Sequence, residues 1–149
     1  MLPQVQANFV HTGKVELIFF DLPLQMHPHA FRAAEAAACA GDQGKFWEMH
    51  EVLFANQQAL APEQLPGYAE QAGLDVAAFQ KCFAGGRHSP KIRDEIRIAH
   101  TLLGITGTPA YLLGRRIPGG DKVEVLEIVH SLLPYEDLEK KLNALLASE

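Results

Sequence analysis

The sequence has little of what marks membrane-spanning, nucleic-acid-binding or newly exported proteins. No apolar run approaches the roughly 20 residues needed to cross a bilayer, so no membrane span is expected. Basic residues do not cluster beyond the pair Arg115-Arg116 and the net charge is −5, which argues against nucleic acid as a partner. The N-terminal Met-Leu-Pro-Gln-Val-Gln has neither the basic start nor the apolar stretch of a signal peptide, so we expect none within this chain.

Cysteine is also scarce. The chain has two, Cys39 and Cys82, and they do not form a Cys-x-x-Cys motif. Two buried free thiols are expected in a reducing compartment and a disulfide in an oxidising one, and the sequence alone does not choose between them. No Ser-His-Asp or phosphate-loop spacing is present, and the pair Gly119-Gly120 is interpreted as a turn.

What the sequence does contain is the composition of one globular domain. Its 149 residues are 48% hydrophobic and 21% charged, and a chain of this length can bury about 68–70% of its unfolded surface. The periodic pattern predicts the end of a helix over residues 2–11, a buried strand over 15–20, helices throughout 27–103, a strand after Pro109, a turn over 115–122, a return strand over 123–129 and a helix over 134–147. This order predicts an α/β fold that carries a large helical insertion. Within the insertion, Asp75 is expected to cap a helix over 76–84 that stops at Gly85-Gly86, and Ser89 to cap the next helix.

The stretch Gly104-Ile-Thr-Gly-Thr-Pro109 connects the last helix of that insertion to the next strand. A trans proline that opens a strand is the simpler interpretation, because a strand's first residue can lack an amide hydrogen. A cis bond between Thr108 and Pro109 would instead direct the Thr108 backbone outward, where an extended peptide could pair with it. Spacing alone leaves both open.

Several other residues were considered for binding roles. His27, His29 and His50, with Glu48 or Glu51 nearby, could form a metal site, but His50 lies on an apolar helical stripe and is interpreted as a core residue. We therefore expect no metal. Phe46, Trp47 and Phe54 are interpreted as core residues. The pair Arg115-Arg116 is interpreted as part of a solvated turn.

Four segments together resemble the DsbA-like branch of the thioredoxin superfamily. The resemblance covers essentially the whole chain, and the Gly-Lys-Phe-Trp-Glu-x-His block is its most specific part. The segments are Gly13-Lys-Val-Glu-Leu-Ile-Phe-Phe-Asp-Leu-Pro-Leu, Ala36-Ala-Ala-Cys-Ala, Gln43-Gly-Lys-Phe-Trp-Glu-Met-His-Glu-Val-Leu-Phe54 and Gly104-Ile-Thr-Gly-Thr-Pro109.

The resemblance implies a single domain over residues 1–149, with a thioredoxin part at 1–26 and 104–149 and a helical insertion at 27–103. It implies that Pro109 is a cis proline and that Thr108 and Pro109 hold a substrate strand. It also implies a structural disulfide between Cys39 and Cys82, because the family often has cysteines at both positions.

The chain departs from the family in one large respect. The first catalytic strand and its Cys-x-x-Cys would precede residues 2–11, and neither is present, so no catalytic residue is assigned. A thioredoxin-like sheet lacking that strand would have two unpaired edges. The two strands could close on each other, a second copy could supply a strand in a homodimer, or the natural polypeptide could extend upstream of Met1. We expect the last, so that this chain is truncated.

The expected function is that of a DsbA-like thiol–disulfide oxidoreductase domain that is inactive by itself, because its dithiol lies outside the chain. By resemblance it would be periplasmic or otherwise extracytoplasmic and would act on cysteine-containing proteins or peptides without a cofactor. The alternative is a non-catalytic peptide-binding or assembly module of the same fold. The glutathione-dependent isomerases of the superfamily fit less well, because of the Trp47 block and the two cysteines of the insertion.

Overall fold

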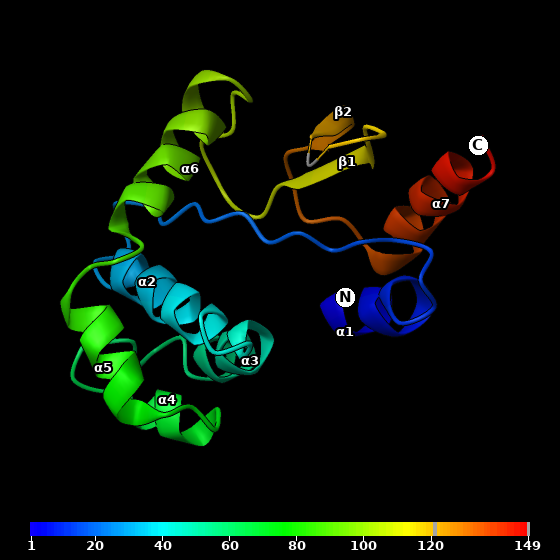
Figure 1. Ribbon diagram of the computed structural model, residues 1–149. Coiled ribbons are helices and arrows are strands. Elements are labelled where there is room, and N and C mark those ends of the chain that lie inside the picture. Colours follow the sequence, from blue (N-terminus) through cyan, green and yellow to red (C-terminus); the bar gives the residue numbers. More distant parts are fainter. Residues whose placement is uncertain (121, 149) are drawn as a thin grey trace. The chain divides into compact units, whose positions relative to one another are not determined.

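The computed structural model describes residues 1–120 and 122–148. The chain divides into two compact units, one formed by Met1–Phe20 with Ile105–Glu149 and the other by Asp21–Gly104. Figure 1 shows the elements of both along the chain. Within the described residues, no helix combines the length and the apolar character that a membrane crossing requires.

The unit Asp21–Gly104 is helical. Its helices are α2 (Ala30–Gly41), α3 (Phe46–Ala55), α4 (Leu65–Gln71), α5 (Val76–Ala84) and α6 (Ser89–Thr101). Ala36 and Ala40 of α2 have no exposed surface, and their small side chains allow α3 and α5 to pack closely against this helix. Met49, Leu65 and Phe79 are fully buried in the same core. The predicted cap of α5 is confirmed, since Asp75 accepts a hydrogen bond from the Ala78 amide at 3.0 Å.

The other unit combines helices with a hairpin. Its elements are α1 (Leu2–Val5), the π-helical turn η1 (Gln6–Val10), β1 (Tyr111–Arg116), β2 (Val123–Val129) and α7 (Tyr135–Leu146). The core of this unit consists of Val5, Phe9, Leu113, Leu138 and Leu142. The helix predicted over residues 2–11, the hairpin and the C-terminal helix are therefore present.

β1 and β2 pair antiparallel, with a register shift between Leu113 and Gly114. Gly114 is required at this irregularity, because a Cβ there would overlap the carbonyl oxygen of Glu124 on the facing strand. Backbone contact this close leaves no room for a side chain.

The strand predicted over residues 15–20 is wrong. The sheet of the described residues contains only β1 and β2, and residues 15–20 form an irregular segment, drawn in blue in Figure 1. Ile18 and Phe20 are 57% and 38% exposed, so the segment is not buried on both faces. Strand composition reflects packing on a pleated, half-buried surface, and here no neighbouring strand among the described residues provides a ladder.

Two local assignments were also wrong. Arg115 and Arg116 were predicted in a solvated turn, but they end β1: Arg115 donates to the Leu145 carbonyl at 2.9 Å and Arg116 forms an ion pair with Glu16 at 2.6 Å. Ser89 was predicted to cap α6, but His88 occupies the N-cap position and the Ser89 hydroxyl donates to Glu35 instead. In both cases a tertiary partner outweighs the local signal.

Candidate functional site

The loop before β1 lines an open hollow. Residues 104–110 leave the end of α6, and the Thr108–Pro109 peptide bond is cis, the isomer that the resemblance implies. The hollow has a volume of about 380 Å³ and is lined by Thr106, Gly107, Thr108, Pro109, His130, Ser131 and Leu132. Both walls belong to the same unit, and the second wall is the chain that leaves β2.

Exposed loop residues form one wall of this hollow, hereafter the Thr108 groove. Thr106, Gly107 and Thr108 are exposed, and none of the backbone hydrogen bonds recorded outside regular elements among the described residues involves them. The ladder with β2 begins only at Tyr111. Leu132, on the opposite wall, is 80% exposed. Free amides and carbonyls next to an exposed leucine suit pairing with an extended peptide better than chemistry on a small molecule.

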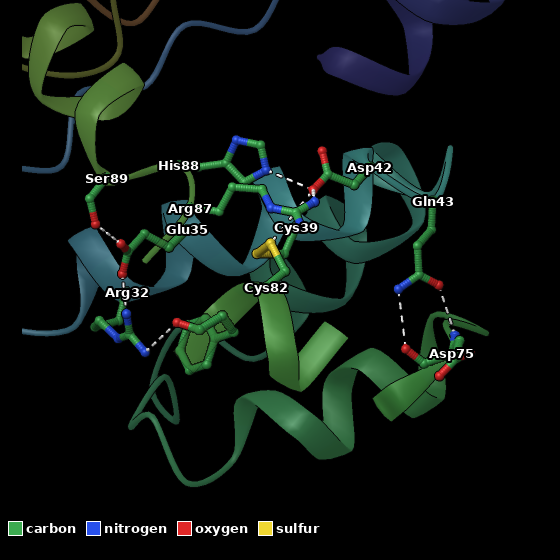
Figure 2. The surroundings of a disulfide bond; sticks show 11 residues. Arg32, Glu35, Cys39, Asp42, Gln43, Asp75, Cys82, Arg87, His88 and Ser89 are labelled. Carbon is green, nitrogen blue, oxygen red and sulfur yellow. Dashed lines mark hydrogen bonds and ion pairs between the residues drawn. A yellow bond between two sulfur atoms is a disulfide. The ribbon is translucent and has the colours of Figure 1, made fainter. Parts of the chain in front are cut away.

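The second feature is the disulfide between Cys39 of α2 and Cys82 of α5, shown in Figure 2. The Cα atoms are 5.9 Å apart and both residues are at least 95% buried. The described residues contain no free cysteine. The bridge implied by the resemblance is therefore present, and it joins α2 to α5 through two cysteines that are 43 residues apart in the sequence.

A polar shell covers one side of this bridge. Asp42, directly after α2, lies 3.6 Å from the Cys82 sulfur, 3.0 Å from His88 Nε2 and 2.9 Å from Arg87 Nη1 (Figure 2). The hydrogen bond with His88 is the main reason that the pKa of Asp42 lies below its ordinary value, and Arg87 adds to this effect. Asp42, Arg87 and His88 were not predicted as site residues, because only tertiary packing brings them to the disulfide.

On the other side, a buried carboxylate is fully partnered. Glu35 of α2 is 2% exposed, and it accepts hydrogen bonds from Arg32 and from the Ser89 hydroxyl. The Arg32 guanidinium also lies 3.6 Å from the centre of the Phe83 ring. This network satisfies the charge of Glu35 and joins α2 to the start of α6.

A second buried carboxyl lies at the beginning of the same unit. Asp21 is 6% exposed, and its backbone amide donates to Glu95 Oε2 at 3.0 Å. Burial, and then the nearby charge of Glu95, raise the pKa of Asp21 to about 6. Lys91 forms an ion pair with Glu95 at 2.6 Å and partly opposes the shift.

His27, His29 and His50 do not belong to any cluster of three or more potential metal ligands among the described residues. The one group of three histidine, cysteine or acidic residues that the described residues bring within ligand distance is Cys39, Cys82 and His88. His50 is 6% exposed and its ring stacks on Phe54, with 4.3 Å between centroids. Burial lowers the pKa of His50. His50 is thus a core residue, in agreement with its sequence interpretation.

The architecture defines a class: a mixed α/β chain in which a helical unit stabilised by a disulfide is inserted ahead of a hairpin and a terminal helix. Residues 1–130 match the model of the family described as Thioredoxin. The chain therefore belongs to this thioredoxin family.

The curated relatives are longer proteins. Among them are the Na(+)/H(+) antiporter NhaA 1 of Salinispora arenicola, 40% identical over 126 residues, and the Na(+)/H(+) antiporter NhaA 3 of Salinispora tropica, 39% identical over 126 residues. Each match covers 83% of this chain and 19% of the relative. The Na(+)/H(+) antiporter NhaA of Herminiimonas arsenicoxydans is 35% identical over 100 residues, which cover 64% of this chain and 16% of the relative. The chain thus spans about a fifth of these relatives.

Proposed function

We propose that this chain is the peptide-holding part of a DsbA-like thiol–disulfide oxidoreductase domain, and that an extended peptide pairs with the backbone of Thr106, Gly107 and Thr108. The observation that carries the proposal is the Thr108 groove, where exposed backbone groups outside any ladder face an exposed leucine. Main-chain pairing of this kind gives affinity without a particular sequence. It suits a domain that acts on unfolded proteins.

The chain by itself does not exchange disulfides under this proposal. Both cysteines are bonded to each other and buried, whereas exchange needs an accessible thiolate of lowered pKa. The catalytic dithiol would lie in a longer polypeptide, outside the 149 residues. The Cys39–Cys82 bridge fits an extracytoplasmic location, because structural disulfides persist in oxidising compartments.

A second candidate function is a non-catalytic binding module, and the relatives favour it. They are named as antiporters, and this chain corresponds to about a fifth of each. In that role the Thr108 groove would hold a peptide segment of the same or a partner polypeptide, or an exposed strand edge of the β1–β2 sheet would pair between two copies in a homodimer. The natural full-length protein separates the candidates. Insulin reduction that is lost when a Cys-x-x-Cys outside these 149 residues is replaced by serines supports the oxidoreductase, and peptide binding without turnover supports the module.

Peptide holding is tested by amide hydrogen exchange with a reduced, alkylated, unfolded protein as the probe. We expect protection at Thr106, Gly107 and Thr108. Leu132→Asp should weaken binding, because it places a charge on the apolar wall of the groove. Leu102→Asp is the matched control, since Leu102 is 71% exposed and does not line the groove. Equal binding by the two variants, or protection elsewhere only, would rule out the groove.

A further inference from the structure

We propose that, when the Cys39–Cys82 disulfide is reduced, Cys39, Cys82, His88 and Asp42 bind one thiophilic divalent cation of the zinc class. The inference does not depend on the peptide groove. It concerns only the unit Asp21–Gly104, which contains all four residues.

Four potential ligand atoms lie close together at the bridge. The sulfurs of Cys39 and Cys82 and an imidazole nitrogen of His88 lie within 4.8 Å of one another. Asp42 Oδ2 lies 3.6 Å from the Cys82 sulfur and 3.0 Å from His88 Nε2. Ligands of tetrahedral zinc are about 3.3–3.8 Å apart, as bonds of about 2.0 Å to nitrogen or oxygen and 2.3 Å to sulfur require. Binding therefore requires the two sulfurs to separate once their bond is broken, and His88 Nε2 and Asp42 Oδ2, now 3.0 Å apart, to move slightly apart.

Helices and helix ends position all four ligands. Cys39 and Asp42 are three residues apart, on the same side of the end of α2. Cys82 lies on α5, and His88 is the N-cap residue of α6. Figure 2 shows the His88 ring and the Asp42 carboxylate next to the bridge. The cysteines are buried, while the His88 and Asp42 side chains are 18% and 34% exposed, so a cation can enter from the polar side.

The charges around the bridge also suit a divalent cation. Two thiolates and a carboxylate around a divalent cation leave one net negative charge. Arg87, already 2.9 Å from Asp42, supplies the compensating positive charge. Cysteine, histidine and carboxylate ligands in this combination are those that zinc accepts.

The chemistry balances in two steps. A dithiol reductant transfers two electrons and two protons to the bridge, so that its own sulfurs form a disulfide and Cys39 and Cys82 become thiols. Cation binding then forms two metal–sulfur bonds and releases the two thiol protons to solvent. Exchange with a disulfide oxidant, which takes up the two electrons and two protons and becomes a dithiol, re-forms the Cys39–Cys82 bond and releases the cation, so the disulfide and the metal site are mutually exclusive states of the same residues.

The test is a cobalt(II) titration of the full 149-residue chain, reduced with a water-soluble phosphine that does not compete for the metal. We expect one cobalt per chain, with thiolate-to-cobalt charge-transfer absorption and tetrahedral visible bands that zinc displaces. The oxidised chain should give no such bands. His88→Ala and Asp42→Asn should bind on the order of tenfold more weakly or worse, because each removes a ligand.

The matched control is His100→Ala, which removes an exposed histidine from the last turn of α6 and should bind like the parent. Circular dichroism of the oxidised variants establishes that each retains its fold, since none of these substitutions replaces a cysteine of the bridge. Absence of thiolate–cobalt bands in the reduced parent would overturn the proposal. So would bands of equal affinity in His88→Ala, which would mean that the cysteines bind metal without the assigned partners.

Discussion

The carboxyl of Asp21 offers a quantitative test of the helical unit. Asp21 is buried beside Glu95, and its pKa is raised from 3.8 to about 6. Substituting Asp21→Asn keeps the size of the side chain and removes the charge that burial and Glu95 disfavour. The side-chain amide of the new asparagine can donate a hydrogen bond to Glu95, as the protonated carboxyl of Asp21 does. We therefore expect Asp21→Asn to be more stable than the parent near neutral pH.

The sign and size follow from proton linkage. Between about pH 4 and pH 6 the folded parent holds a proton on Asp21 that the unfolded chain has lost, so its free energy of unfolding falls as the pH rises. Above pH 6 both states are ionised and the penalty is constant. A shift from 3.8 to about 6 corresponds to about 3 kcal/mol. Asp21→Asn should match the parent below about pH 4 and exceed it by about 2–3 kcal/mol at pH 7.

Urea unfolding at a series of pH values measures this difference. The matched control is Asp94→Asn on α6, because Asp94 is exposed and forms an ion pair with Arg97 at the surface. Its difference from the parent should stay within about 0.5 kcal/mol at every pH. A difference between Asp21→Asn and the parent that does not change with pH, or a less stable variant at pH 7, would refute the reasoning.

The remaining predictions concern covalent and backbone constraints. Replacing both Cys39 and Cys82 with alanine should lower the free energy of unfolding by about 4 kcal/mol, because the bridge spans 43 residues. Urea unfolding of the reduced parent should show a similar loss. An unchanged urea midpoint would contradict a stabilising role of the bridge. Gly114→Ala should cost about 1–3 kcal/mol, because its Cβ would meet the Glu124 carbonyl. Gly67→Ala, in open space within α4, should instead stabilise by about 0.5–1 kcal/mol, and thermal unfolding of the two alanine variants should move in opposite directions.

Local signals explain what was predictable. Val76–Ala84 was predicted to its exact residues because Asp75 caps it and Gly85-Gly86 follows it, and the limits of β2 were predicted equally well. These features depend on neighbours in the sequence. The residue pattern of 15–20 is equally strong, yet no strand forms there, because a strand needs a partner that the residue pattern does not contain.

The residues that surround the disulfide could not be predicted from the sequence for the same reason. Nothing local connects Asp42 to His88, or Ser89 to Glu35, since each pair is separated by more than 40 residues. The resemblance implied the Cys39–Cys82 bridge but not the shell around it. The sequence by itself determined the limits of α5 and β2 and the presence of the hairpin and the two cysteines, because capping, periodicity and composition act over a few residues. The tertiary structure alone decided which side chains surround the sulfurs and which backbone groups remain open at Thr108, because both depend on contacts between distant segments.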